Sequence, residues 1–107
     1  MPHIFCVYGH LAGLDRASLG LSQELLSDYE CTAQGTVLDF IHEGHYIDVQ
    51  AELDALVAAL PPTVRGIIDI IDHQEWQMFR CTLQGGVLHT ERIALDNALD
   101  TAYATER

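Results

Sequence analysis

The chain has 107 residues, of which 49% are hydrophobic, and its 16 acidic residues against five arginines give a formal net charge of −11. A chain of this length forms one core, so we expect residues 1–107 to be a single globular domain. The charge excludes direct nucleic-acid binding, which needs a basic stripe, and the apolar runs are far shorter than the roughly 20 residues that a membrane span requires.

The first half of the chain alternates predicted strands and helices. Residues 3–8 are rich in strand-forming side chains and stop at Gly9, which predicts a buried strand. Asp15 is a good N-cap for a helix that continues towards Tyr29. We expect this helix to bury one apolar face, formed by Leu14, Ala17, Leu21 and Leu25. Ser18, Ser22 and Ser27 are expected to be solvated positions or caps.

The middle of the chain repeats this alternation. Residues 36–42 predict a second strand, closed by a turn at Glu43 and Gly44. Residues 48–60 predict a helix that begins after Asp48 and stops before two prolines, and its apolar positions have helical spacing: Val49, Leu53, Leu56 and Leu60. Residues 65–72 hold four isoleucines and predict a third strand, in which Asp69 needs a hydrogen-bonding partner.

The last part of the chain predicts a hairpin. Residues 75–83 and 87–95 alternate around Gln84-Gly85-Gly86, a typical hairpin turn. One face of this hairpin is expected to carry Phe79, Cys81, Leu83, Leu88 and Thr90. The other face is expected to carry Trp76, Met78, Arg80, Thr82, Val87, His89, Glu91 and Ile93. Asp96 is a candidate N-cap for a last helix.

The expected order of elements is therefore β-α-β-α-β-β-β-α, a mixed α+β architecture. It predicts one mixed sheet in which parallel crossovers come first and the antiparallel hairpin follows, with helices packed on the sheet. This order resembles the thioredoxin-like topology, although the chain has no Cys-x-x-Cys pair. A ferredoxin-like sandwich with one extra strand is the alternative.

Histidines follow all three of the first predicted strands. They are His10, the pair His42 and His45, and His73, which follows Asp72. The carboxyl ends of parallel strands meet at one edge of a sheet, where ligands commonly bind. These residues are therefore one candidate site, for a bound transition metal or for acid/base chemistry. The spacing of His42 and His45 does not fit the helical zinc-protease motif, which needs histidines four residues apart.

The outer face of the hairpin is the other candidate site. Trp76, Met78, Arg80 and His89 combine aromatic, apolar and cationic side chains, a composition typical of protein interfaces. We expect a protein partner or self-association through this face, through the negative surface, or through both. The main hypothesis is therefore a protein-binding or regulatory module without enzymatic activity, and a basic protein surface is a suitable partner.

The cysteines and the start of the chain suggest where the protein works. Cys6, Cys31 and Cys81 are odd in number and widely spaced, which predicts free thiols in a reducing compartment. The first residues have neither a basic flank nor a long apolar region typical of a secretion signal. We expect a cytoplasmic protein that folds without disulfides and requires no cofactor.

Overall fold

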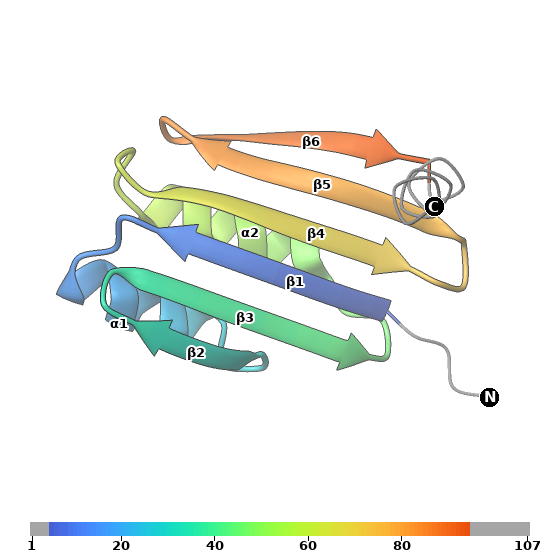
Figure 1. Ribbon diagram of the computed structural model, residues 1–107, viewed down its shortest axis with the longest axis horizontal. Helices are drawn as coiled ribbons and strands as arrows, with labels where there is room; N and C mark the ends of the chain where they lie inside the picture. The colour runs from blue at the N-terminus through green and yellow to red at the C-terminus, as the bar shows by residue number, and fades with distance from the viewer. Residues whose placement is uncertain (1–4, 95–107) are drawn as a thin grey trace, which may run out of the picture.

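The computed structural model describes residues 5–94, which form a six-stranded sheet with two helices on one of its faces (Figure 1). The strands lie in the order β2-β3-β1-β4-β5-β6. The elements, in chain order, are β1 (Phe5–Ala12), α1 (Arg16–Leu25), β2 (Glu30–Gln34), β3 (Val37–Gly44), α2 (Val49–Ala59), β4 (Arg65–Asp72), β5 (Gln77–Gln84) and β6 (Val87–Ile93).

The predicted topology is wrong, because every pair of neighbouring strands is antiparallel. The thioredoxin-like arrangement needs parallel neighbours and is therefore excluded. From β1 to β4 the elements follow the β-α-β-β-α-β order of a ferredoxin-like sandwich. That alternative also needs correction, since the sheet continues by two strands, β5 and β6, where one was expected. The predicted helix after Asp96 lies outside the described residues.

β2 was not predicted; it is an edge strand that forms a hairpin with β3. Gly35 forms the turn between them with a φ of 62°, a conformation that favours glycine. β2 pairs with a neighbour on one side only, and four of its five side chains are exposed. It therefore lacks the run of apolar residues that identified the other strands.

β1 is longer than predicted and does not stop at Gly9. It continues to Ala12, and the ring of Phe40 on β3 lies directly against Gly9. A Cβ atom at position 9 would overlap the ring atoms of Phe40. The glycine is therefore explained by close packing within the sheet, whereas the sequence suggested a turn.

Helix α1 buries only part of the face that was predicted. Leu14 is buried and Leu25 packs against the core, but Ala17 and Leu21 are exposed, and Ser18 and Ser22 are buried in their place. The Ser22 hydroxyl donates to the Ser18 carbonyl at 2.8 Å, which satisfies this hydroxyl inside the helix. Because this hydrogen bond is made locally, a serine can be buried here, and the apolar pattern alone did not indicate it.

Helix α2 and the C-terminal hairpin follow the sequence more closely. Asp48 caps α2 by accepting the Ala51 amide, and its four predicted apolar residues, Val49, Leu53, Leu56 and Leu60, are all buried. Gly85 and Gly86 form the predicted turn between β5 and β6. The core lies between the sheet and the helices, and Cys81 and Leu83 extend it onto β5.

Candidate functional site

The face of the sheet away from the helices is the candidate site. Side chains alternate along each strand, so Val7 and Ile68 point into the core while their neighbours Tyr8 and Ile67 point outwards. No described element packs on this outward side (Figure 1). We call it the open face, and its central residues are Tyr8, His10, Asp39, Ile41, Ile67, Asp69, Arg80 and Thr82.

Large apolar side chains lie exposed on the open face. Ile41 on β3 is 42% exposed, Ile67 on β4 is 49% exposed, and Val87 on β6 is 51% exposed. Tyr8 on β1 lies between Ile41 and Asp69 in the cross-strand register. Ile41, Tyr8 and Ile67 lie on three consecutive strands, β3, β1 and β4, and form a patch, whereas Val87 lies apart on the edge strand β6. Such patches mark interaction surfaces more often than single exposed residues do.

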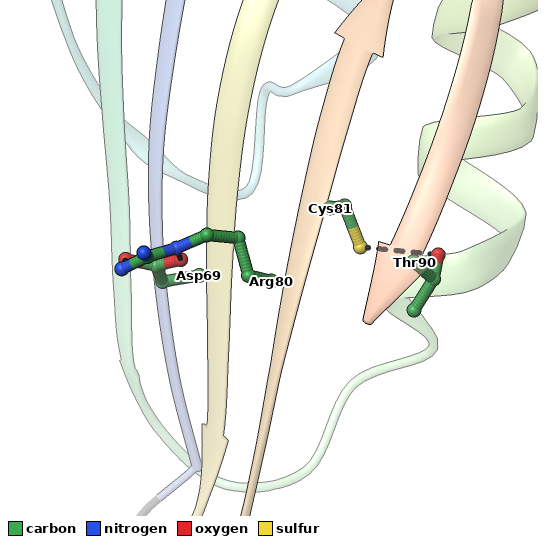
Figure 2. Close-up of polar contacts among 4 residues, drawn as sticks. All are labelled: Asp69, Arg80, Cys81 and Thr90. Carbon is green, nitrogen blue, oxygen red and sulfur yellow. Dashed lines mark hydrogen bonds and ion pairs between the residues drawn. The ribbon is translucent and has the colours of Figure 1, made fainter. Parts of the chain in front are cut away.

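An ion pair between β4 and β5 lies among these apolar residues. Asp69 accepts two hydrogen bonds from Arg80, from Nε at 2.7 Å and from Nη2 at 3.1 Å. These bonds raise the pKa of the Arg80 guanidinium, and the negative charge of Glu91 raises it further. Figure 2 shows this pair on one side of the strands, while Cys81 and Thr90 lie on the side of the helix. The predicted partner for Asp69 is confirmed.

A second polar pair joins β1 and β3. The Nδ1 atom of His10 lies 2.7 Å from Oδ1 of Asp39, and both side chains are about half exposed. Since a carboxylate only accepts hydrogen bonds, Nδ1 carries the proton and Nε2 of a neutral ring is an acceptor. His10 borders two shallow depressions, of about 350 Å³ towards Arg65 and Thr82 and about 510 Å³ towards Tyr8 and Ile41.

A third polar contact involves Tyr8 itself. Its hydroxyl donates to Oε2 of Glu43 at 2.6 Å. This hydrogen bond is the main reason that the pKa of Tyr8 lies above its usual value. The acids Asp39, Glu43 and Asp69 on the open face therefore each have a hydrogen-bonding partner on a neighbouring strand.

The predicted interaction residues lie partly on this face. Met78, Arg80 and His89 occupy its β5 and β6 strands, where His89 pairs in register with Thr82. Trp76 does not lie on a strand, because β5 begins at Gln77. It lies in the β4–β5 turn with a φ of 55°, and its ring contacts His73 at 6.0 Å between ring centroids.

The predicted histidine cluster does not form, because β1 runs antiparallel to both β3 and β4. β4 ends at Asp72, with His73 next in the chain, at the end of the sheet where β1 begins, and His42 and His45 lie at that same end, around the end of β3. His10 lies towards the opposite end and on the open face. The expectation that all four histidines converge depended on parallel strands, and it fails with them.

His42, near the end of β3, and His45, directly after the strand, contact each other. Nε2 of His42 donates to the carbonyl oxygen of His45 at 2.8 Å, and their rings lie edge to face. Within residues 5–94, no group of three or more histidine, cysteine or acidic side chains has a geometry that holds a metal ion. The described residues therefore give the metal hypothesis no ligand set.

Tyr8, Ile41 and Ile67 were not predicted to be surface residues. Each belongs to a run of apolar residues, such as Ile67 beside Ile68, and such a run does not indicate which of its side chains are exposed. The polar residues His10, Asp39 and Asp69 alternate with the buried ones at a spacing of two. This alternation was the available signal that one face of the sheet is open.

Comparisons with protein-family models, with curated proteins and with solved structures gave no match. Among the described residues, no helix is long and apolar enough to cross a membrane. The function must therefore be inferred from the geometry of the open face itself.

Proposed function

We propose that the protein is a binding module that recognises another protein through the open face of its sheet. The observation that carries this proposal is the exposure of two isoleucines in the middle of a face that no described element covers. Ile41 lies beside Tyr8 on one side of β1, and Ile67 lies beside His10 on the other side. Burial of apolar area is the main favourable term in protein association. The same strands hold the core on their other side, so the surface is rigid before binding.

The size of the open face supports this proposal. Its six strands have five to eight residues each. With about 4.8 Å between strands and a rise of about 3.4 Å per residue, the face covers roughly 700 Å². A typical protein interface buries about 800 Å² on each partner. A partner of ordinary size would therefore cover most of the face at once.

The polar contacts lower the free-energy cost of covering this face with a partner. Covering an unpaired carboxylate costs several kcal/mol, as a rough order of magnitude, because the charge loses its water. Asp39 and Asp69 are bound by His10 and Arg80, and Glu43 is bound by Tyr8. A partner that covers these acids does not need to supply new donors for each of them.

A site-specific photo-cross-linker tests the proposal. The photoreactive residue replaces Ile67 on the open face in one variant and Leu21, which is exposed on α1, in a control variant. We expect a discrete protein adduct in cells from position 67 only. A second substitution, Ile41→Ser, should remove this adduct while the protein remains folded. Adducts of equal yield from both positions, or none from position 67, would contradict the proposal.

The His10–Asp39 pair supports a second candidate, an acid/base site on the same face. The hydrogen bond to Asp39 places the proton of a neutral His10 ring on Nδ1, so that Nε2 is the acceptor beside two depressions, the arrangement of a general base. Such a base should react with diethyl pyrocarbonate faster than His89, and Asp39→Asn should slow the reaction of His10. Equal reactivity of the two histidines, unaffected by this substitution, would leave His10 without a special role.

A further inference from the structure

The positions of the charged side chains on the open face indicate which charges a binding partner should carry. The face carries five acids, Glu30, Asp39, Glu43, Asp69 and Glu91, and two arginines, Arg65 and Arg80. The acids Asp39 and Asp69 lie on the inner strands and are paired there. The charge at the edges of the open face therefore comes from the remaining acids.

Two exposed acids lie at opposite edges of the sheet. Glu30 is on β2 and Glu91 is on β6, which are the two edge strands. The two edge strands are five strand spacings apart, or about 24 Å. Within residues 5–94, Glu30 has no hydrogen-bonding or ion-pair partner, and Glu91 lies beside the already paired Arg80. Among the described residues, Glu30 therefore has no cation beside it, and at the other edge the single positive charge of Arg80 faces two acids, Asp69 and Glu91.

A second copy of this chain is a poor fit to the face. Each copy has a net charge of −11, and two open faces in contact would set five acids and two arginines against an identical set. Like charges across an interface suppress association. The helix side of the molecule is also negative, so it does not offset this repulsion. Residues 15–28 and 48–59 contain one basic residue, Arg16, and six acids: Asp15, Glu24, Asp28, Asp48, Glu52 and Asp54.

We infer that the open face binds a different protein, whose surface has an apolar centre flanked by basic side chains about 24 Å apart. The apolar centre covers Ile41 and Ile67, and the basic side chains meet Glu30 and Glu91. This inference rests on the proposed function, to which it adds the charge of the partner. The negative charge of the whole molecule speeds the encounter, while the two edges orient the partner across the strands.

Two synthetic peptides provide a defined probe. Each is an 18-residue helical peptide, about 27 Å long, with the same central leucine stripe. One peptide has lysines at both ends and the other has glutamates there. Binding to the ¹⁵N-labelled full chain is followed by amide chemical shifts at low and at physiological salt. We expect the lysine peptide alone to bind, with shifts centred on β1, β3 and β4.

Matched variants separate the edges from the general charge. Glu30→Gln with Glu91→Gln should weaken binding of the lysine peptide on the order of tenfold at low salt. Glu24→Gln with Asp28→Asn removes the same charge near α1, where both acids are exposed, and should change binding less than about twofold. Equal weakening by both variants, or shifts confined to the helices, would overturn the inference in favour of unspecific attraction.

Other outcomes distinguish failure of this inference from failure of the proposed function. Equal binding of both peptides at the open face would overturn the basic partner but retain the binding face. Binding that is unchanged by Ile67→Ser would overturn the proposed function as well. If neither peptide binds and sedimentation shows a dimer that Ile67→Ser dissociates, the partner is a second copy and the inference is wrong.

Discussion

The two faces of the sheet are made by the same strands and differ in almost every other respect. On the helix side, Phe40 and Ile68 are buried together in one apolar core. On the open side, their neighbours Ile41 and Ile67 lie among three polar pairs. One face therefore buries the core that stabilises the fold, while side chains on the other face remain exposed to solvent.

Adjacent isoleucines on β4 test this comparison with the largest expected effect. Ile68 is 1% exposed and Ile67 is 49% exposed. Ile68→Ala leaves a cavity in the core and should lower the free energy of unfolding by about 2–5 kcal/mol. Ile67→Ala should lower it by less than about 1 kcal/mol. Denaturant unfolding measures both values, and similar losses for the two variants would contradict the division into faces.

Two glycines should respond to alanine with opposite signs. The Cβ of Gly9→Ala would overlap Phe40, so this variant should lose about 1–3 kcal/mol of stability. Gly20 lies in α1 with no atom within 4 Å of an added Cβ, and Gly20→Ala should gain about 0.5–1 kcal/mol. Thermal unfolding compares the variants. Gly9→Ala should cost less stability in a Phe40→Leu background than in the native chain, and an equal cost in both backgrounds would argue against this overlap as the cause.

The Asp69–Arg80 pair should contribute little to stability, since it lies on the open face. Their side chains are 24% and 45% exposed, so solvent screens the attraction. A double-mutant cycle with Asp69→Ala and Arg80→Ala should give a coupling energy of about 0.2–1 kcal/mol. A coupling of several kcal/mol would mean that the pair is covered in the intact protein.

The smallest effect concerns the start of α1. Asp15 accepts a hydrogen bond from the Ser18 amide at 2.7 Å, and this bond lowers the pKa of its carboxyl group. A lowered pKa in the folded state stabilises the protein above the unfolded pKa of about 3.9 and loses this effect as the pH falls through the folded value. The difference in Tm between the native chain and Asp15→Ala should therefore be present at pH 6 and shrink towards pH 3. A difference independent of pH would contradict this cause.

The sequence predicted those parts of the fold whose signal is local. The caps and spacing of residues 48–60, the glycine turn at 85–86 and the isoleucine strand at 65–72 each follow from neighbouring residues, and all three are present. Strand direction is not a local property, because it depends on which strands pair across long loops. The parallel crossovers were wrong for this reason, and the histidine cluster was lost with them.

The candidate site was predicted in part. Asp69 was singled out because a charge inside an apolar strand needs a partner, and Arg80 because it lies on the outer face of the predicted hairpin. The cross-strand register brings these two residues together. Ile41 and Ile67 were not singled out, since an isoleucine in a strand has the same appearance on a covered face and on an open one. An isoleucine in a strand is exposed or buried according to whether helices cover one face of the sheet or both, and this depends on the tertiary structure.

The most direct test of the open face is the solvent accessibility of isoleucine methyl groups in the full chain. A soluble gadolinium chelate added to the methyl-labelled protein enhances the relaxation of groups that it can approach. We predict strong enhancement at Ile41 and Ile67 and little at Ile68, because only Ile68 points into the core. If Ile41 and Ile67 were as protected as Ile68, the open face would be covered in the isolated protein, and the account of a binding surface would be wrong.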